Sequence, residues 1–179
     1  MMVIGLVCSG TLSAADLQDG IFGLQWRENL SQRDAFSKLR SSTHVDYYMK
    51  TGEVYSINDV AVSSVVYGSY ADQFFAVYIK IETIEVFDDI RRYMKSRYGI
   101  PDKTEKLKNE QTEYRWKYKD IKIKLKLDEK ENKMKLAFYY QPLSKKINEE
   151  QEEKFRSESL KLFPIDKKKK PEMMPLLQF

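Results

Sequence analysis

Histidine and cysteine are almost absent from this sequence, which holds one residue of each among 179. One histidine cannot supply a histidine-based metal cluster, and any Ser-His-Asp system would have to use His44, next to the polar run Ser41–Thr43. Adjacency in a loop does not provide the geometry of a triad, so we interpret His44 as a solvated loop residue. The single cysteine, Cys8, excludes a disulfide within the chain.

Glycine is also scarce, and its seven residues form no GxGxxG or GxxxxGK pattern of a phosphate-binding loop. The carboxylates are equally uninformative. Asp88 and Asp89 point about 100° apart on an expected helix, which is poor geometry for a hydrolase pair, so we attribute them to the helix dipole. The run Glu149–Glu153 is typical of a solvated helix face. We therefore predict no catalytic, cofactor-binding or metal-binding residues; an enzyme with an unrecognised carboxylate or tyrosine site is the alternative.

The composition that is present fits one globular domain. Hydrophobic residues make up 42% and aromatic residues 13% of the chain, and 12 Tyr and 9 Phe favour strands. The chain has 31 basic and 27 acidic residues, so its net charge is only +4. Such mild basicity permits an anionic partner without requiring one.

The first fifteen residues resemble a signal peptide without a basic n-region. An apolar run, Met1–Val7, is followed by the small residues Ser13, Ala14 and Ala15, as at a signal-peptidase site. Cleavage there would remove Cys8 and leave a mature chain without a thiol. We predict a periplasmic or secreted protein, and a cytoplasmic one if this interpretation fails.

We expect four parts along the chain: a signal peptide at 1–15, an α+β domain at 16–143, a peripheral charged helix at 144–164 and a flexible basic tail at 165–179. The helix has a thin apolar stripe and is stopped by Pro164. The tail contains Lys167–Lys170 and then apolar residues, so weak contact with an anionic membrane surface is an alternative to a solvated tail.

The clearest local signals lie between residues 74 and 101. Residues 74–81 alternate as a strand does, and Thr83 can cap a helix that runs to Tyr98 and is stopped by Gly99 and Pro101. We also expect a helix from Ser31 to Arg40, packed like the first on the sheet, and short antiparallel strands between residues 45 and 82. The predicted fold is α+β: a single, mainly antiparallel sheet with two packed helices and a peripheral C-terminal helix.

A three-stranded meander follows, after a polar link at residues 102–111. A two-residue turn at Lys119 and Asp120 would pair Tyr118 with Ile121 and Trp116 with Ile123. A four-residue loop would then pair Ile123 with Phe138 and set Asp128 opposite Lys133. All three strands thereby agree on one apolar face.

The opposite face of this meander would be strongly basic. In the predicted register Lys117 lies opposite Lys122 and Arg115 lies opposite Lys124, and like charges so placed are unfavourable. This tension indicates an anionic partner, although lysines that keep an exposed face soluble would have the same pattern. The aromatic residues of the first strand take the other face, which argues against nucleic acid. The candidate surface consists of Arg115, Lys117, Lys122, Lys124, Lys126 and Lys135.

The helix ending in Tyr98-Gly99-Ile100-Pro101, followed by a strand with Trp116 and Tyr118 and by two more strands, resembles the BamE (SmpA/OmlA-like) family of small bacterial envelope proteins. The likeness covers residues 84–140. It implies a helical pair with a Gly-x-Pro turn before a three-stranded meander, and a non-enzymatic role in assembly. The chain departs from that pattern in having many strands before the helix and no clear lipobox at Cys8.

These observations favour a non-enzymatic, exported protein that binds another protein or an anionic component of the envelope, without a cofactor. The alternatives are the enzyme named above and, if the N-terminus is not a signal, a nucleic-acid-binding domain.

Overall fold

The computed structural model describes residues 17–42, 44–51, 55–62, 64–107 and 111–162, and the predicted signal peptide and basic tail lie outside these ranges. The N-terminal half contains β1 (Gly20–Ile21), β2 (Leu24–Gln25), a 3-10 helix η1 (Leu30–Gln32), β3 (Phe36–Ser42), β4 (Val45–Lys50), β5 (Tyr55–Ile57), β6 (Val60–Val62), β7 (Ser64–Tyr70) and β8 (Gln73–Ile81). The second half contains α1 (Ile84–Tyr98), β9 (Lys103–Leu107), β10 (Gln111–Tyr118), β11 (Ile121–Asp128), β12 (Lys133–Tyr140) and α2 (Gln141–Leu162).

Eight of the strands form one antiparallel sheet in the order β3-β4-β7-β8-β12-β11-β10-β9. The chain divides into two units, residues 1–144 with this sheet and residues 145–179. The predicted α+β class with a mainly antiparallel sheet is confirmed.

The register of the meander agrees with the prediction at each stated pair. Tyr118 lies opposite Ile121, and Trp116 lies opposite Ile123. On the next strand Ile123 faces Phe138, and Asp128 faces Lys133. The alternation of large apolar residues with lysines over eight positions fixes this register, because a slip by one residue would bury the lysines.

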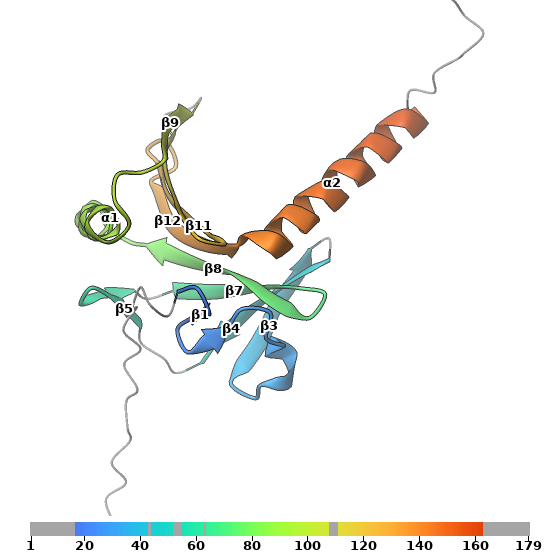
Figure 1. The fold of residues 1–179 in the computed structure, drawn as a ribbon, viewed down its shortest axis with the longest axis horizontal. Helices are drawn as coiled ribbons and strands as arrows, with labels where there is room; N and C mark the ends of the chain where they lie inside the picture. Colours follow the sequence, from blue (N-terminus) through green and yellow to red (C-terminus); the bar gives the residue numbers. More distant parts are fainter. Residues whose placement is uncertain (1–16, 43, 52–54, 63, 108–110, 163–179) are drawn as a thin grey trace, which may run out of the picture. The chain divides into compact units, whose positions relative to one another are not determined.

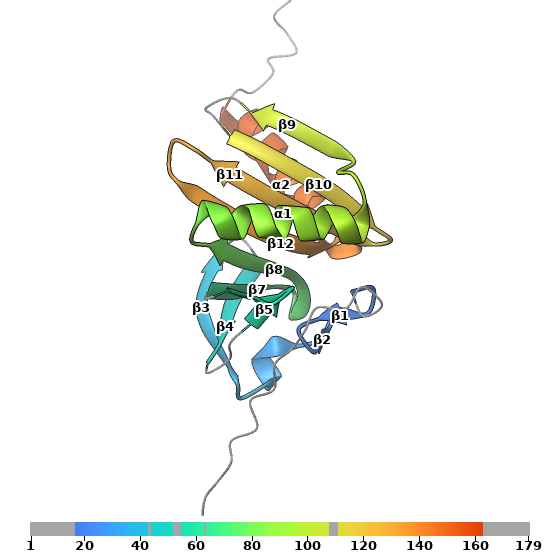
Figure 2. The same cartoon turned by 90° about the vertical axis from the view of Figure 1, so that its left-hand side faces the viewer.

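Helix α1 forms where its capping signals predict it. The Thr83 side chain accepts a hydrogen bond from the Val86 amide, and the Gly99 amide donates to the Lys95 carbonyl at the other end. Gly99 has φ +82°, a conformation that favours glycine. Figure 2 shows α1 lying in front of the meander strands.

One face of the sheet carries the main core, and α1 packs on that face (Figure 1). Phe87, Ile90 and Met94 of α1 belong to the same buried cluster as Trp116 and Phe138 of the meander. Strands β4, β7 and β8, the small β5–β6 hairpin and the N-terminal segment with β1, β2 and η1 also contribute side chains to this cluster.

The predicted helix from Ser31 to Arg40 is wrong. Only Leu30–Gln32 form a 3-10 turn, capped by Asn29, and residues 36–42 form the edge strand β3. Contacts with two other strands decide this. Lys38 forms an ion pair of 2.9 Å with Asp46 of β4, and the Phe36 ring meets the Tyr67 ring of β7 edge-on, with the ring centres 5.2 Å apart. These non-local contacts outweigh a weak local helix signal.

The polar link predicted at 102–111 is also wrong in part, because Lys103–Leu107 form β9 and pair with β10. The C-terminal helix is confirmed as α2, which begins at Gln141, three residues before the predicted start. No helix in the described ranges has the length and apolar character needed to cross a membrane.

Candidate functional site

The six predicted basic residues lie together on the sheet face that points away from α1, which we call the basic face. Their register is as predicted: Lys117 faces Lys122 and Arg115 faces Lys124. Lys126 also faces Lys135, so like charges are opposed on both sides of the central strand β11. The charge repulsion inferred from the sequence is therefore present in the fold.

A buried carboxylate, Glu113, lies within this basic face and was missed by the sequence analysis. It forms ion pairs with Arg115 and with Lys124, the latter at 3.3 Å. Burial by itself would raise the pKa of Glu113, but the hydrogen bond from Arg115 and the charge of Lys124 outweigh it and lower the pKa below its ordinary 4.5. Its position two residues before Arg115 was a usable signal, since such residues share a face.

The basic face continues beyond the meander. Lys135 of β12 lies opposite Lys80 of β8, so Lys80, Lys135 and Lys126 form a row across three adjacent strands. The charge of Lys80 is compensated by an ion pair of 3.1 Å with Glu82. Nothing local in the sequence indicates that β12 pairs with β8, so the continuation of the basic face onto β8 could not be predicted.

Tyrosines border the basic residues on the same face. Tyr139 lies opposite Lys122 in the register. The Tyr139 ring meets the Tyr78 ring edge-on, with the ring centres 5.7 Å apart. The centres of the Tyr78 and Tyr47 rings are 6.0 Å apart. The Arg40 guanidinium covers the Tyr47 ring at 4.7 Å. Burial raises the pKa of Tyr139 to about 12 and also raises the pKa of Tyr78, so both hydroxyls stay protonated at neutral pH. They can donate hydrogen bonds but are poorly suited to act as bases.

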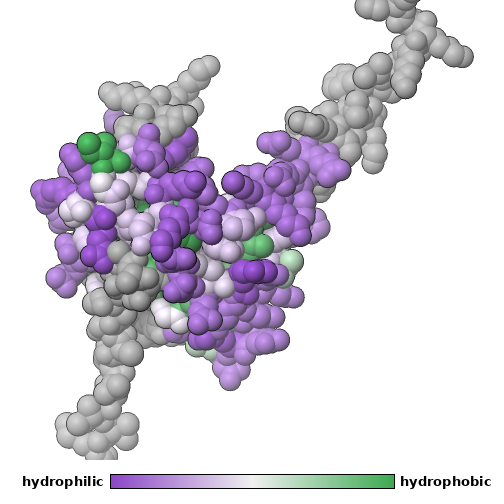
Figure 3. Space-filling view, in the orientation of Figure 1, coloured by the Kyte–Doolittle hydropathy of each residue, from purple (hydrophilic) through white to green (hydrophobic). Residues whose placement is uncertain are grey.

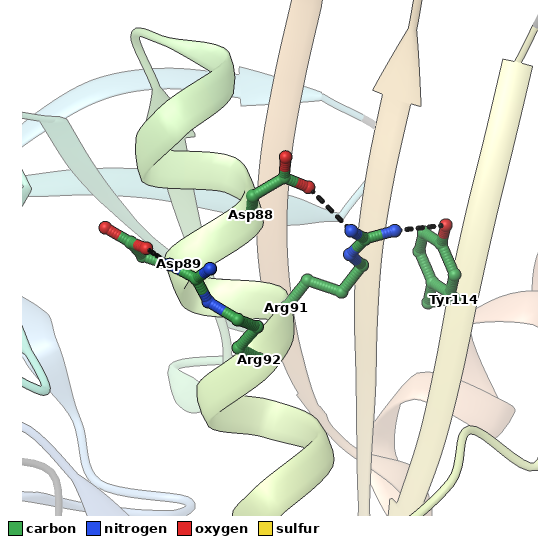
Figure 4. A network of polar contacts seen from close by, with 5 residues as sticks. All are labelled: Asp88, Asp89, Arg91, Arg92 and Tyr114. Carbon is green, nitrogen blue, oxygen red and sulfur yellow. Dashed lines mark hydrogen bonds and ion pairs between the residues drawn. The ribbon is translucent and has the colours of Figure 1, made fainter.

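A second group of charges is fixed on the other face, along α1 (Figure 4). Arg91 donates to the Tyr114 hydroxyl at 3.2 Å and pairs with Asp88 at 2.9 Å, and its guanidinium lies 5.7 Å from the centre of the Tyr114 ring. Arg92 pairs with Asp89 one position further along. The two aspartates therefore have arginine partners three residues on, in addition to any effect of the helix dipole.

A groove of about 390 Å³ lies beside this network, and we call it the α1 groove. Its walls combine three cations with apolar and aromatic side chains: Arg91, Arg92, Lys95, Ile100, Pro101, Tyr114 and Trp116. A more open hollow of about 630 Å³ lies on the other side of Arg92 and includes Asn58, Asp89 and Arg97. Elsewhere, most of the described surface in Figure 3 is hydrophilic.

Comparison with family models, with curated proteins and with solved structures found no match for this chain. The resemblance to the BamE family is therefore neither supported nor contradicted, and it stays a prediction.

Among the residues that the structure describes, the candidate ligands for a metal ion lie apart. In the part of the chain that the structure describes, no three His, Cys, Asp or Glu side chains gather in a way that could hold a metal ion. His44 is exposed in the turn between β3 and β4, with φ +67°. The arrangement consists of positive charge displayed on two faces, which is suited to binding anions.

Proposed function

We propose that this protein is a non-enzymatic binding protein of the cell envelope, and that its basic face contacts an anionic partner. The partner would be an acidic protein surface or another anionic envelope component. The observation that carries this proposal is the opposition of like charges across adjacent strands, at three positions within the meander.

Opposed lysines reduce stability unless something compensates their charge. Glu113 forms ion pairs with Arg115 and Lys124 and lies opposite Lys126 in the register, but no carboxylate of the described residues lies within ion-pair distance of Lys117 or Lys135. A partner with negative charge would offset this repulsion on binding. Lysines that serve only solubility would instead give no preference for this face over other basic surface positions.

Export belongs to the same proposal. It is supported by the signal-like pattern of residues 1–15. An assembly role of the kind implied by the BamE resemblance would fit a binding protein without catalytic groups. Contact of Lys167–Lys170 with a membrane is a further, independent proposal on residues outside the described ranges.

Single-stranded nucleic acid is a second candidate, because aromatic rings beside a basic strip can stack bases. The tyrosines Tyr47, Tyr78 and Tyr139 give this candidate the aromatic component that the sequence analysis did not find on the basic face. Their rings already pack on one another, which leaves less surface for stacking.

The test compares two triple variants with equal loss of charge. The first is Lys117→Gln, Lys126→Gln and Lys135→Gln on the basic face; Lys124 is left in place because it neutralises Glu113. The control carries Arg27→Gln, Arg33→Gln and Lys130→Gln, which lie in connections outside the strands that form the basic face. The probes are polyglutamate, phosphatidylcholine vesicles with and without phosphatidylglycerol, and an oligothymidylate.

We expect polyglutamate or the anionic vesicles to bind the native protein in a salt-dependent way. Each lysine near an anionic surface contributes about 1 kcal/mol, so the first triple variant should weaken binding at least about tenfold, and the control about twofold or less. Equal weakening by both triples would contradict a specific basic face. Clear preference for the oligothymidylate would instead support the nucleic-acid candidate.

A further inference from the structure

We propose that the α1 groove is a second binding site, which takes the C-terminal carboxylate of a partner peptide together with the apolar side chain of its last residue. The groove lies on the α1 side of the sheet, whereas the basic face is on the opposite side. The inference therefore does not depend on the function proposed above.

The cationic wall of the groove is held in place before any ligand binds. Arg91 is restrained by three contacts, with Asp88, the Tyr114 hydroxyl and the Tyr114 ring. Its side chain nevertheless remains 42% exposed. A guanidinium that is fixed but accessible loses little conformational freedom when a carboxylate binds, which favours affinity.

The balance of charge at the groove suits a ligand with a single negative charge. Arg91, Arg92 and Lys95 supply three positive charges, and their partners Asp88 and Asp89 remove two of them. Lys95 has no carboxylate partner among the described side chains, so it supplies the net positive charge of the groove, beside the accessible guanidinium of Arg91. A phosphate monoester carries roughly −1.5 to −2 at neutral pH and would meet repulsion from the two aspartates, whereas a carboxylate carries one charge.

The other wall of the groove is apolar and rigid. Ile100 is 79% exposed, and it follows Gly99 and precedes Pro101 at the end of α1. The Trp116 indole N–H donates to the Gly99 carbonyl at 2.9 Å, which fixes this turn against the sheet. Single exposed apolar residues are ordinary, but an isoleucine held beside three cations matches a ligand that is apolar at one end and anionic at the other.

The size of the apolar wall favours a peptide end over a long acyl chain. Its apolar and aromatic members are Ile100, Pro101, Tyr114 and the buried Trp116, in a groove of about 390 Å³. This volume is near the lower end for ligand pockets. One terminal side chain with its carboxylate fills such a groove, whereas a long acyl chain would extend past these residues.

The protein carries its own reporter for the test. It has two tryptophans, of which Trp116 lines the groove and Trp26 belongs to the N-terminal part of the core. The full chain, labelled with ¹⁵N, is titrated with the N-acetylated dipeptide Leu-Phe as a free acid, with its C-terminal amide, with phenyl phosphate and with decanoate. The two indole N–H signals are followed by NMR.

We expect the free acid to shift the Trp116 signal in a saturable way and to leave the Trp26 signal unchanged. The amide should bind at least about fivefold more weakly, since it lacks the charge. Lys95→Glu should weaken binding of the acid by at least about fivefold, and Ile100→Ser by a similar factor through lost apolar contact. Both residues are exposed, so the fold should tolerate these changes.

The matched control is Arg97→Glu, the same change of charge on the same helix at a residue that lines the other hollow. It should alter the affinity by about twofold or less. Equal weakening by Arg97→Glu and Lys95→Glu, equal binding of acid and amide, or no saturable shift would overturn the proposal. Tighter binding of phenyl phosphate or of decanoate would likewise overturn the choice of a peptide carboxylate.

Discussion

Glu113 is a buried carboxylate among lysines and arginines, and its energetic role can be tested directly. Replacement by Gln keeps the size of the side chain and removes the charge that Arg115 and Lys124 share. Hydrogen bonds to charged groups contribute roughly 1.5–3 kcal/mol, so we expect Glu113→Gln to lower the free energy of unfolding by about 1–3 kcal/mol. Urea unfolding monitored by tryptophan fluorescence measures this change.

The loss should depend on pH in a definite direction. The pKa of Glu113 in the folded state lies below its ordinary 4.5, so its contribution is present above pH 4.5 and is lost as the pH falls through the folded value. The difference in free energy of unfolding between the native protein and Glu113→Gln should therefore become smaller in acid. The control is Glu131→Gln, whose exposed pair with Lys133 should cost about 0.5 kcal/mol or less. If the difference in free energy of unfolding between the native protein and Glu113→Gln stayed constant down to strongly acidic pH, this role for Glu113 would be contradicted.

Single residues show how far sequence reasoning reaches. Each of the six predicted basic residues lies on the expected face, because alternation along a strand needs only local information. Tyr78 and Tyr47 could not be placed beside them, since this depends on which distant strands become neighbours. The α1 groove was missed for the same reason: Arg91 and Tyr114 are 23 residues apart.

At the scale of elements, the β1–β2 hairpin depends on a close approach between its two strands. A Cβ added at Gly20 would lie 1.8 Å from the Leu24 carbonyl oxygen, which is backbone and cannot move aside cheaply. We expect Gly20→Ala to destabilise the protein by about 3 kcal/mol or more, since the strands must separate and Ile21 and Leu24 lose burial. Thermal unfolding measures the effect.

Gly23 in the turn of the same hairpin is the matched control. A Cβ there would meet nothing within 4 Å, but the residue has φ +74°. Gly23→Ala should therefore cost only about 1–2 kcal/mol, from backbone strain. If Gly23→Ala were as damaging as Gly20→Ala, the close approach of the strands would not be the dominant effect.

The elements differ in how well the sequence predicts them. Strands β10 to β12 and helix α1 were predictable because each has a strong period and clear ends. The segment 31–40 has a capping pattern but few apolar residues, so its structure is decided by pairing with β4. Strand β9 is short and polar, and it lies at the sheet edge, where no alternation of apolar residues is required.

For the molecule as a whole, the decisive feature is the pairing of β8 with β12. This contact spans α1 and the rest of the meander, and it joins the N-terminal strands and the meander into one sheet. It also places Lys80 and Tyr78 next to the basic residues of the meander. Pairing between strands so far apart in sequence depends on the packing of α1 and the core, which local patterns do not specify.

The proposed export makes a prediction about the whole chain. Leu17, the first residue that the structure describes, is buried, and its carbonyl accepts a hydrogen bond from the Trp26 indole at 2.9 Å. Removal of residues up to Ala14 or Ala15 would leave both partners of this contact in the mature chain. Intact-mass measurement of the protein from its native cells should give an N-terminus at Ala15 or Asp16. The same sample should not react with a thiol reagent, since Cys8 is the single cysteine. A mass that includes residues 1–14, or a reactive thiol, would contradict export by this signal and would favour the cytoplasmic alternatives.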